Sequence, residues 1–426
     1  MDTYRIWTVG CQMNKADSER LGSALDQLGL KSVDNNQDAD IVVLNSCVVR
    51  QSAEDRVIGN LNIAGAVKKK NPGQVVALMG CMVGAQTDQL KKKFPYVDLF
   101  MRPQEYSPLL DMVGESRGLD WEGCVGSLAP SEPNISTYVP IIHGCDLMCT
   151  FCIIPYRRGR QVSRPVEDVG HEIELLVQRG VKEVTVLGQT VDAYGLDLPG
   201  EPDLSDLFVR LNSISDLERI RFLTSHPSFM TQRIIDSVKD LTKVCEHINL
   251  PVQSGDDEIL GLMRRPYSRS EYIELVSRIR DSIPNVSIST DLIVGFPGET
   301  PEQYENSLDL VRELKFDKVH CAAYSTRPGT IADRTMVDNV PQDEKVRRLK
   351  EVDSVQEDIL RQINSKLVGN ELEVLVEGQK NGRWQSRTRT DKIVFFDHDN
   401  VKIGDIVNVT VESSTAWSLQ ATPIVV

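Results

Sequence analysis

Short apolar runs rich in Val and Ile alternate with helix-forming stretches along most of this 426-residue chain. Three such runs, YRIWTVG, ADIVVLNS and QVVALMG, lie before residue 118, and a helical pattern follows each. The first helical pattern, KADSERLGSALDQLG, spaces three leucines along one face and stops at Gly29. Continuous apolar strands that alternate with helices are typical of parallel sheets covered on both faces. Residues 1–118 are therefore predicted to form a doubly wound α/β domain.

A second series of apolar runs follows, YVPIIHG, EVTVLGQ, RIRFLTS, HINLPVQ, SISTDLIVGF and KVHCAAYS. These runs start about 30–45 residues apart, which is the length of a βα unit. Six such units predict a partial (βα)6 barrel over residues 137–365, with its chemistry at the carboxyl ends of the strands. Those ends carry polar or sulfur-containing residues, namely Cys145, Gln189, Ser225, Gln253, Asp291 and Tyr324.

The remaining segments differ in pattern from these two domains. The stretch from about Gly118 to Ser136 contains two prolines and is predicted to be a linker. Residues 341–368 are charged and helical in pattern, and they begin at Pro341. Residues 366–426 contain the short β runs ELEVLVEG, GRWQSRTRT, KIVFF and IVNVTVESS. They predict a small all-β barrel.

The overall charge limits which surfaces are available to a nucleic acid. The chain has 48 Lys and Arg against 62 Asp and Glu, a net charge of −14. This balance argues against a protein that coats nucleic acid with its whole surface, although a local basic patch remains compatible with it. No apolar run reaches the roughly 18 residues of a membrane span. The start, MDTYRIWTVGCQMNK, lacks the pattern of a secretory signal. We therefore expect a cytoplasmic protein with no membrane partner.

Nine cysteines, an odd number, in a chain expected in a reducing compartment argue against a disulfide framework. Cys145, Cys149 and Cys152 form a CxxxCxxC motif directly after the first barrel strand. Three thiolates on one loop suit a [4Fe–4S] cluster and leave one iron without a protein ligand. The alternative is a zinc knuckle, but structural zinc normally has four ligands, and His143 is awkwardly placed to be the fourth.

A second set of cysteines follows the three N-terminal strands. Cys11, Cys47 and Cys81 end the segments TVGC, LNSC and LMGC, with separations of 47 − 11 = 36 and 81 − 47 = 34 residues. The carboxyl ends of neighbouring parallel strands meet at one edge of a sheet. The sequence therefore predicts a second three-cysteine cluster, the alternative being inert core thiols. Cys124, Cys245 and Cys321 show no such pattern and are expected to be small buried hydrophobes.

Basic side chains gather in two places. Arg157, Arg158, Arg160 and Arg164 follow the CxxxCxxC loop. The predicted β barrel carries Lys380, Arg383, Arg387, Arg389 and Lys392 around Trp384. Basic residues with an aromatic suit looped or single-stranded RNA, whereas a solvated surface is the alternative. The GFPGE segment, with Gly295, Gly298 and Glu299, predicts a tight loop that lets the backbone approach a cofactor.

These motifs together resemble a known family. A CxxxCxxC motif after the first strand of a βα barrel, with Phe151 before the last cysteine, resembles the radical S-adenosylmethionine (radical SAM) enzymes. Two three-cysteine sets and a C-terminal β domain resemble the methylthiotransferases within that superfamily. The similarity extends over nearly the whole chain, in GCQMNKADSE, LNSCVVRQSAE, IIHGCDLMCTFCIIPYRRGRQVSRP, VLGQTVDAYG, FLTSHP, LPVQSGDDEIL, STDLIVGFPGET and YSTRPGT.

Two further segments indicate the branch of the family. GCQMN and TRTDKIVFF resemble the branch that acts on tRNA, the tRNA-2-methylthio-N6-dimethylallyladenosine synthases. The chain departs from the usual family pattern at GCMVGAQ, at the Ser before Cys47 and at Thr190, none of which is an expected ligand. The resemblance implies that the C-terminal domain, residues 366–426, is a TRAM RNA-binding domain.

The resemblance also implies a mechanism. Cys145, Cys149 and Cys152 would hold one [4Fe–4S] cluster, whose open iron binds SAM and generates a 5′-deoxyadenosyl radical. That radical would take hydrogen from C2 of N6-isopentenyladenosine beside the tRNA anticodon. Cys11, Cys47 and Cys81 would hold a second [4Fe–4S] cluster that presents sulfur, and a second SAM would supply the methyl group. No catalytic side chain is expected beyond the cluster ligands.

Cofactor and partner contacts follow from the same resemblance. SAM is expected to contact residues at the strand ends and the CxxxCxxC loop, namely Phe151, Gln189, Ser225, Gln253 and Asp291. RNA contacts are expected from Arg157, Arg158, Arg160, Lys380, Arg383, Trp384, Arg387 and Arg389. The expected partners are a tRNA anticodon stem-loop and an external electron donor, and the protein is expected to be a monomer.

Two alternative functions remain open. The same chemistry could act on threonylcarbamoyl-adenosine in tRNA or on an aspartate of a ribosomal protein; the basic strip around Trp384 favours RNA over protein. A non-catalytic electron-transfer protein or zinc-stabilised RNA-binding module would instead have closed metal sites, which two three-cysteine sets contradict.

Overall fold

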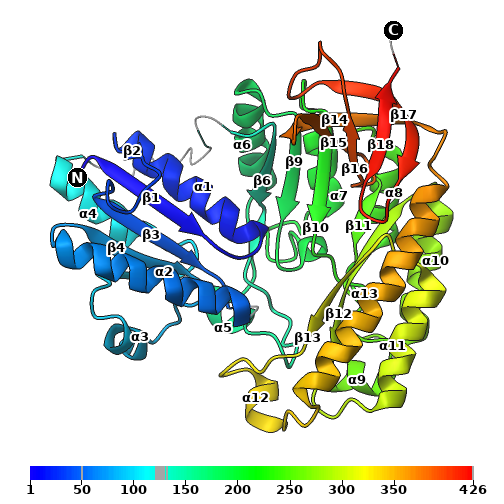
Figure 1. Cartoon of the computed structure of the whole chain (residues 1–426), viewed down its shortest axis with the longest axis horizontal. Helices are drawn as coiled ribbons and strands as arrows, with labels where there is room; N and C mark the ends of the chain where they lie inside the picture. The colour runs from blue at the N-terminus through cyan, green and yellow to red at the C-terminus, as the bar shows by residue number, and fades with distance from the viewer. Residues whose placement is uncertain (49–50, 120–129, 131–132, 425–426) are drawn as a thin grey trace.

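The computed structural model describes residues 1–48, 51–119, 130 and 133–424. The chain forms an N-terminal α/β part, a central curved sheet with helices on its outside and a small C-terminal barrel (Figure 1). Cys124 and most of the predicted linker lie outside the described residues.

The N-terminal part contains, within the described residues, a five-stranded parallel sheet in the order β2-β1-β3-β4-β5. Its strands are β1 (Thr3–Thr8), β2 (Lys31–Ser32), β3 (Ile41–Ser46), β4 (Val75–Gly80) and β5 (Leu99–Met101). Its helices are α1 (Gln12–Gln27), α2 (Gln51–Lys70), α3 (Asp88–Lys93) and α4 (Ser107–Arg117). Every residue of the central strand β3 is buried, as a strand covered on both faces requires.

This sheet confirms the doubly wound domain expected from the sequence. The three predicted strands are β1, β3 and β4, whereas β2 and β5 are too short to give an apolar run. Helix α1 begins directly after Cys11, which is its N-cap residue. The helix therefore fixes Cys11 at the carboxyl end of β1.

The central part contains all six predicted strands. They are β6 (Ser136–Pro140), β9 (Glu183–Leu187), β10 (Arg219–Leu223), β11 (His247–Asn249), β12 (Ser287–Val294) and β13 (Lys318–Ala323). They pair in parallel as two three-stranded sheets, β6-β9-β10 and β11-β12-β13. A parallel bridge between Ile220 and Val244 joins the two sheets. The result is the partial barrel that the βα repeat predicts.

Longer helices cover the outside of this barrel. They are α6 (Val166–Gln178), α7 (Leu204–Asn212), α8 (Gln232–Asp240), α10 (Arg269–Ser282) and α11 (Pro301–Leu314). Shorter elements lie in the loops, namely β7 (Ile142–His143), α5 (Ile154–Arg158), β8 (Val162–Ser163), η2 (Val191–Ala193), α9 (Asp257–Leu262) and α12 (Ile331–Thr335). Aliphatic and aromatic side chains of the strands and outer helices form the largest apolar core.

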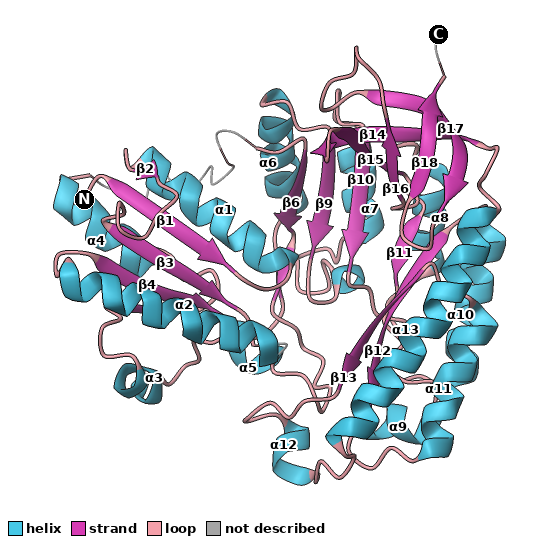
Figure 2. Ribbon diagram, viewed as in Figure 1, coloured by secondary structure: helices cyan, strands magenta, loops and turns pink. Residues whose placement is uncertain are grey.

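Helix α13 (Gln342–Ser365) connects this barrel to the C-terminal part and runs beside β13 (Figure 2). A closed barrel follows in the strand order β14-β15-β16-β18-β17 of the described residues. Its strands are β14 (Glu371–Lys380), β15 (Arg383–Thr388), β16 (Ile393–Phe396), β17 (Ile406–Ser414) and β18 (Leu419–Pro423). The structure thus confirms the small barrel and adds β18, a short strand that the sequence pattern did not indicate.

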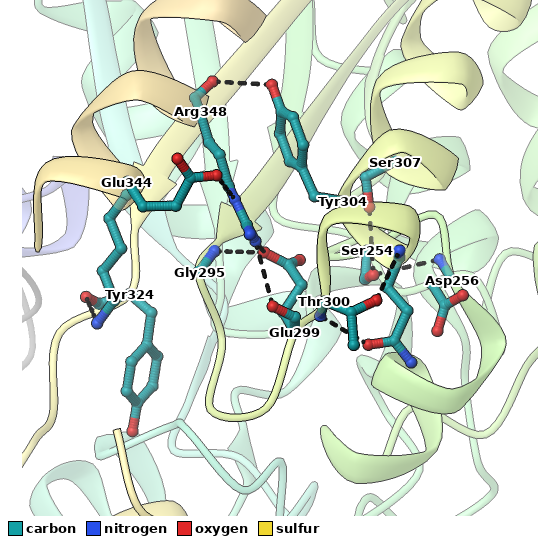
Figure 3. A network of polar contacts seen from close by, with 12 residues as sticks. Ser254, Asp256, Gly295, Glu299, Thr300, Tyr304, Ser307, Tyr324, Glu344 and Arg348 are labelled. Atoms are coloured by element: carbon teal, nitrogen blue, oxygen red, sulfur yellow. Dashed lines mark hydrogen bonds and ion pairs between the residues drawn. The ribbon is translucent and has the colours of Figure 1, made fainter. Parts of the chain in front are cut away.

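The GFPGE loop after β12 holds helix α13 in place (Figure 3). The Glu299 carboxylate accepts a hydrogen bond from the Gly295 backbone N–H at 2.6 Å and pairs with Arg348 Nη1 at 2.6 Å. Both charged side chains are almost fully buried, with exposed fractions of 0% and 3%. Gly295 has φ +71°, and a Cβ there would lie 2.4 Å from Lys345 Cγ of α13. The loop was expected to approach a cofactor, but these contacts make it an anchor for α13.

The Glu299–Arg348 pair predicts a large stability difference between two neighbouring substitutions. We expect Arg348→Ala to lower the free energy of unfolding by about 3–5 kcal/mol, because it leaves a buried carboxylate without its partner. Arg347 also pairs with Glu344, but its side chain is 54% exposed. Arg347→Ala should therefore lower the free energy of unfolding by about 1 kcal/mol or less. Denaturant unfolding of both variants measures this difference, and equal losses would contradict the anchoring role.

Candidate functional site

Six cysteines from two domains line one cavity of about 970 Å³. They are Cys11, Cys47, Cys81, Cys145, Cys149 and Cys152. The carboxyl ends of β1 and β3 and those of the barrel strands β6, β9 and β10 point toward the same central region (Figure 1). The two three-cysteine sets predicted from the sequence therefore line the same cavity.

The first set follows strands β1, β3 and β4. Gly10, with φ +138°, allows close approach to Cys47, since a Cβ on Gly10 would lie 2.8 Å from Cys47 Cβ. The buried Asn14 accepts a hydrogen bond from Cys11 Sγ at 3.2 Å and donates to Ser46 O at 2.8 Å. Hydrogen bonds from one side chain thus connect two of the strand ends that carry the cysteines.

The thiols of this set differ in exposure. Cys11 is exposed, whereas Cys47 and Cys81 are buried. Burial raises the pKa of Cys81 to about 11, and the nearby Arg158 guanidinium opposes that rise. A thiolate at this position needs positive charge beside it, because burial disfavours the charged form.

The second set lies on the loop after β6 and β7. Gly144 has φ +68°, and a Cβ there would lie 1.9 Å from Arg160 O, so this tight loop requires glycine. Cys145 Sγ lies 3.5 Å from Thr190 Oγ1. Cys149 Sγ accepts a hydrogen bond from Arg265 Nη1 at 3.7 Å. Burial of the thiol raises the pKa of Cys152 to about 12.

Arg265 was not identified from the sequence. It follows α9, is buried, and donates from Nη2 to Pro251 O at 2.9 Å. The only sequence signal is a basic pair in LMRRPYSR, which resembles many solvated basic pairs. Its side chain places a positive charge beside a buried thiol that is an expected metal ligand.

The chemistry of the two triplets suits iron–sulfur clusters, because cysteine thiolates are the usual protein ligands of such clusters. Among the described residues, no three His, Cys, Asp or Glu side chains converge closely enough to hold one metal ion. An iron–sulfur cluster contains several metal atoms and sulfides, so its cysteine ligands surround a larger space. Two cysteine triplets around a common cavity fit that requirement.

The five side chains proposed as SAM contacts also line this cavity, namely Phe151, Gln189, Ser225, Gln253 and Asp291. Ser225 Oγ is buried and has no hydrogen-bond partner among the described residues, and the same is true of His226 Nε2. Desolvation lowers the pKa of His226 to about 3, so the imidazole is neutral at physiological pH. A polar ligand in the cavity would satisfy both atoms. His226 was not identified from the sequence, where it appears only within FLTSHP.

The β15–β16 turn caps the opposite end of the barrel. Arg389 Nε donates to a Glu246 carboxylate oxygen at 2.8 Å, and Lys392 Nζ pairs with Asp317 at 2.9 Å. Arg387 Nε pairs with Glu377 at 2.7 Å. Arg387 and Arg389 were predicted to contact RNA. In the structure carboxylates hold both of them, and Arg389 lies at the interface between the two barrels.

The remaining predicted RNA contacts have different surroundings. Arg158 is buried in an ion pair with Asp17, so it is not on the surface. The Arg160 side chain is 86% exposed, whereas Arg157 is half-buried. In the small barrel Lys380 is exposed and Arg383 pairs with Asp397.

The two described tryptophans of the C-terminal barrel have different surroundings. Trp384 is half-buried and donates from Nε1 to His398 O at 2.8 Å. Trp417 lies in the turn before β18, is 57% exposed, and lines the cavity with the six cysteines. Asn364 of α13 holds that turn through hydrogen bonds to Thr415 O and Ala416 O at 2.9 and 3.0 Å. The sequence pointed to Trp384 because basic residues surround it, but only Trp417 presents an exposed ring at the cavity.

Two other cysteines remain outside this site. Cys245 is buried, as expected, and Cys321 on β13 is half-buried. Neither lines the cavity. In the described part of the chain, no helix is long and apolar enough to cross a membrane.

Comparison with family models divides the chain in the same order as the structure. Residues 3–102 match the uncharacterized protein family UPF0004, residues 139–311 match the radical SAM superfamily, and residues 365–424 match the TRAM domain.

Curated relatives match along nearly the whole chain. A tRNA-2-methylthio-N(6)-dimethylallyladenosine synthase from Dehalococcoides mccartyi (strain CBDB1) is 45% identical over 422 residues, covering 99% of this chain and 98% of the relative. A protein of the same name from Herpetosiphon aurantiacus is 44% identical, with 98% and 96% covered. A third from Chloroflexus aurantiacus is 42% identical, with 99% and 91% covered.

Solved structures share the fold at much lower identity. The radical S-adenosylmethionine methyltransferase TsrM from Kitasatospora setae matches with a TM-score of 0.59 and 14% identity, over 78% of this chain and 77% of that one. The cobalamin-dependent S-adenosylmethionine radical enzyme OxsB matches with a TM-score of 0.53 and 12% identity, over 84% and 56%.

The contacts of Arg389 predict coupling between the two barrels. We expect Arg389→Ala to destabilise the docked C-terminal barrel by about 1.5–3 kcal/mol, because charged hydrogen bonds to Glu246 and to backbone carbonyls are lost. Lys380→Ala serves as the control, since Lys380 is exposed on the same barrel. Hydrogen exchange of residues 366–424 in both variants reports the docking. Equal protection in the two variants would show that the ion pair does not hold the barrel.

Proposed function

The chain belongs to the family of tRNA-2-methylthio-N(6)-dimethylallyladenosine synthases, and we propose that it methylthiolates C2 of N6-isopentenyladenosine beside the anticodon of tRNA. It is a radical SAM enzyme that uses an iron–sulfur cluster and SAM, and a transferase that acts on tRNA. The observation that carries the proposal is the single cavity lined by two cysteine triplets.

We assign one [4Fe–4S] cluster to each triplet. Cys145, Cys149 and Cys152 ligate the cluster that binds SAM, and Cys11, Cys47 and Cys81 ligate the second. When bound, SAM and the clusters supply the radical that activates the adenine C–H bond, together with the sulfur and methyl groups. An external electron donor completes the reaction. In this assignment each triplet leaves one iron without a protein ligand, open to SAM or to sulfur.

The side chains of the cavity bind and orient these groups. Arg265 places its charge at Cys149, and Thr190 contacts Cys145. Ser225 Oγ and His226 Nε2 offer two unpaired polar atoms for SAM, and we keep Phe151, Gln189, Gln253 and Asp291 as its further contacts.

We propose that RNA contacts an exposed ring at the cavity and exposed positive charges outside it. Trp417 supplies an exposed ring for a base, and Arg160 and Lys380 supply exposed positive charge. Arg157, Arg383 and Trp384 remain partly exposed and stay within this proposal, whereas Arg158, Arg387 and Arg389 do not. A tRNA substrate fits action in the cytoplasm, and we propose that the protein works as a monomer.

The decisive experiment supplies the reconstituted protein with SAM, a reductant and tRNA that carries N6-isopentenyladenosine, followed by mass spectrometry of the nucleosides. The expected product is 2-methylthio-N6-isopentenyladenosine. If tRNA carrying threonylcarbamoyl-adenosine were modified instead, the assigned substrate would be wrong.

The assignment of one cluster to each triplet predicts the iron content of variants that lack one cysteine ligand. The wild-type chain should hold about eight irons, and Cys145→Ala and Cys47→Ala should each hold about four, because each loses one cluster. Cys145→Ala should lose SAM cleavage, whereas Cys47→Ala should retain it and lose sulfur insertion. Cys321→Ala is the control, because Cys321 does not line the cavity. Loss of SAM cleavage in both ligand variants would contradict separate roles.

The exposed ring of Trp417 predicts that its substitution weakens RNA binding. Trp417→Ala should weaken binding of a tRNA anticodon stem-loop by about 1–3 kcal/mol, because one base loses its stacking partner. Trp417→Phe keeps a ring and should bind nearly as well as the wild type. Fluorescence anisotropy of a labelled stem-loop measures both. The idea fails if alanine and phenylalanine at this position bind the RNA equally.

A further inference from the structure

We infer that Arg158 is a positioning residue for the iron–sulfur group of the first triplet, donating hydrogen bonds from Nε and Nη1 to its sulfur atoms. This inference rests on the proposed function, because it assumes that Cys11, Cys47 and Cys81 hold a cluster. Arg158 was predicted from the sequence to contact RNA, and its position in the structure excludes that role.

The Arg158 side chain connects the two parts of the site. It is the last residue of α5, which follows the CxxxCxxC loop, and it extends to Asp17 of α1, which follows Cys11. Arg158 Nη2 donates to Asp17 at 2.9 Å, and the two side chains are 2% and 0% exposed. The pair thus joins the helices that begin beside the two cysteine sets.

Two donor atoms of this buried guanidinium are unused. Nε and Nη1 of Arg158 make no hydrogen bond among the described residues. Buried polar groups are normally hydrogen-bonded, so two such N–H groups on one side chain indicate a missing acceptor. Arg158 lines the cavity with the three cysteines, and its charge acts on Cys11 and Cys81. The missing acceptor therefore lies on the cysteine side of the guanidinium.

The chemistry of that acceptor follows from the ligands. Cysteine thiolates and bridging sulfides are anionic and accept hydrogen bonds, and such bonds adjust the reduction potential of a cluster. Arg265 already makes a contact of this kind, from Nη1 to Cys149 Sγ at 3.7 Å. Among the described residues, each triplet thus has a buried arginine beside it. Arg265 contacts a ligand thiol directly, and Arg158 acts on the Cys81 thiol, while its Nε and Nη1 have no geometric hydrogen-bond partner among the described residues.

A role limited to holding the two domains together would require only the Asp17 contact. It would leave Nε and Nη1 without a function, and a lysine at position 158 would serve equally well. The planar guanidinium instead offers three directions of donation, one used by Asp17 and two without a partner among the described residues.

The test uses the full chain with Cys145, Cys149 and Cys152 all changed to Ala, so that only the first triplet can bind iron. In this background we compare Arg158→Gln, Arg158→Lys and Asp17→Asn after anaerobic reconstitution. The matched control is Arg160→Gln, in the same loop, because the Arg160 side chain is 86% exposed. The readouts are the midpoint potential of the cluster, followed by electron paramagnetic resonance, and the rate at which a chelator removes its iron.

Removal of the positive donor should destabilise the more negative, reduced cluster. We expect Arg158→Gln to lower the midpoint potential and to accelerate iron loss by about tenfold. Arg158→Lys should give an intermediate shift, since it keeps the charge but loses the fork of donors. Asp17→Asn should raise the potential, because it removes a nearby negative charge, and Arg160→Gln should change neither quantity.

The outcomes separate this inference from the proposed function. If Arg158→Gln and Asp17→Asn shift the potential in the same direction, or not at all, Arg158 is a structural ion-pair partner and the inference is wrong. If Arg158→Gln does not fold, Arg158→Lys and Asp17→Asn still give the two opposite shifts that the inference requires. If the three-alanine background binds no iron, the second cluster itself is wrong, and the inference falls with it.

Discussion

The candidate site depends on one constraint, that the carboxyl ends of strands from two separate sheets face each other. Met13 and Ala16 of α1 form a small buried cluster with Leu187 at the end of β9. Asp17 of the same helix forms a buried pair with Arg158 of α5, and Arg20 donates to Glu172 of α6 at 2.6 Å. Helix α1 therefore packs against the barrel through a few apolar contacts and two charged pairs. A shift between the domains would separate the cysteine sets, because each set is fixed to its own sheet.

Buried or half-buried charged pairs recur where parts of this chain meet. Arg348 and Glu299 attach α13 to the barrel, and Arg389 and Glu246 attach the C-terminal barrel to the other end. Buried pairs contribute less to stability than their attraction suggests, since both ions lose their hydration. Removal of one partner is nevertheless strongly destabilising, because the other charge is left buried and unpaired. Such pairs therefore favour one relative orientation of the domains. Such selection suits a site whose ligands are divided between domains.

The features that could be predicted from the sequence were those with a local pattern of residues. The apolar runs and their spacing identified the nine principal strands of the first two domains, and the position of each cysteine at a strand end predicted both triplets. The strand β18 was missed because LQATP is short and partly polar. The carboxylate partners of Arg158, Arg387 and Arg389 were not predicted, because a charged residue in a sequence does not reveal its partner. Their carboxylates lie 141, 10 and 143 residues away. Trp384 and Trp417 could not be told apart, since exposure depends on the fold.

These pairs and the net charge of −14 together bear on how RNA can be held. Arginines that would otherwise form a basic surface are held by carboxylates inside the molecule or at domain contacts. We therefore propose that RNA recognition rests on a few exposed groups and not on a broad electropositive face. A cavity of about 970 Å³ is large enough for a small-molecule cofactor with part of a nucleotide, but not for a folded stem. On the proposed function, the adenine would therefore leave its stack to reach the cysteines, as a base does most easily in a single-stranded loop. Because both triplets line the same cavity, one unstacked base can meet both groups without leaving the protein.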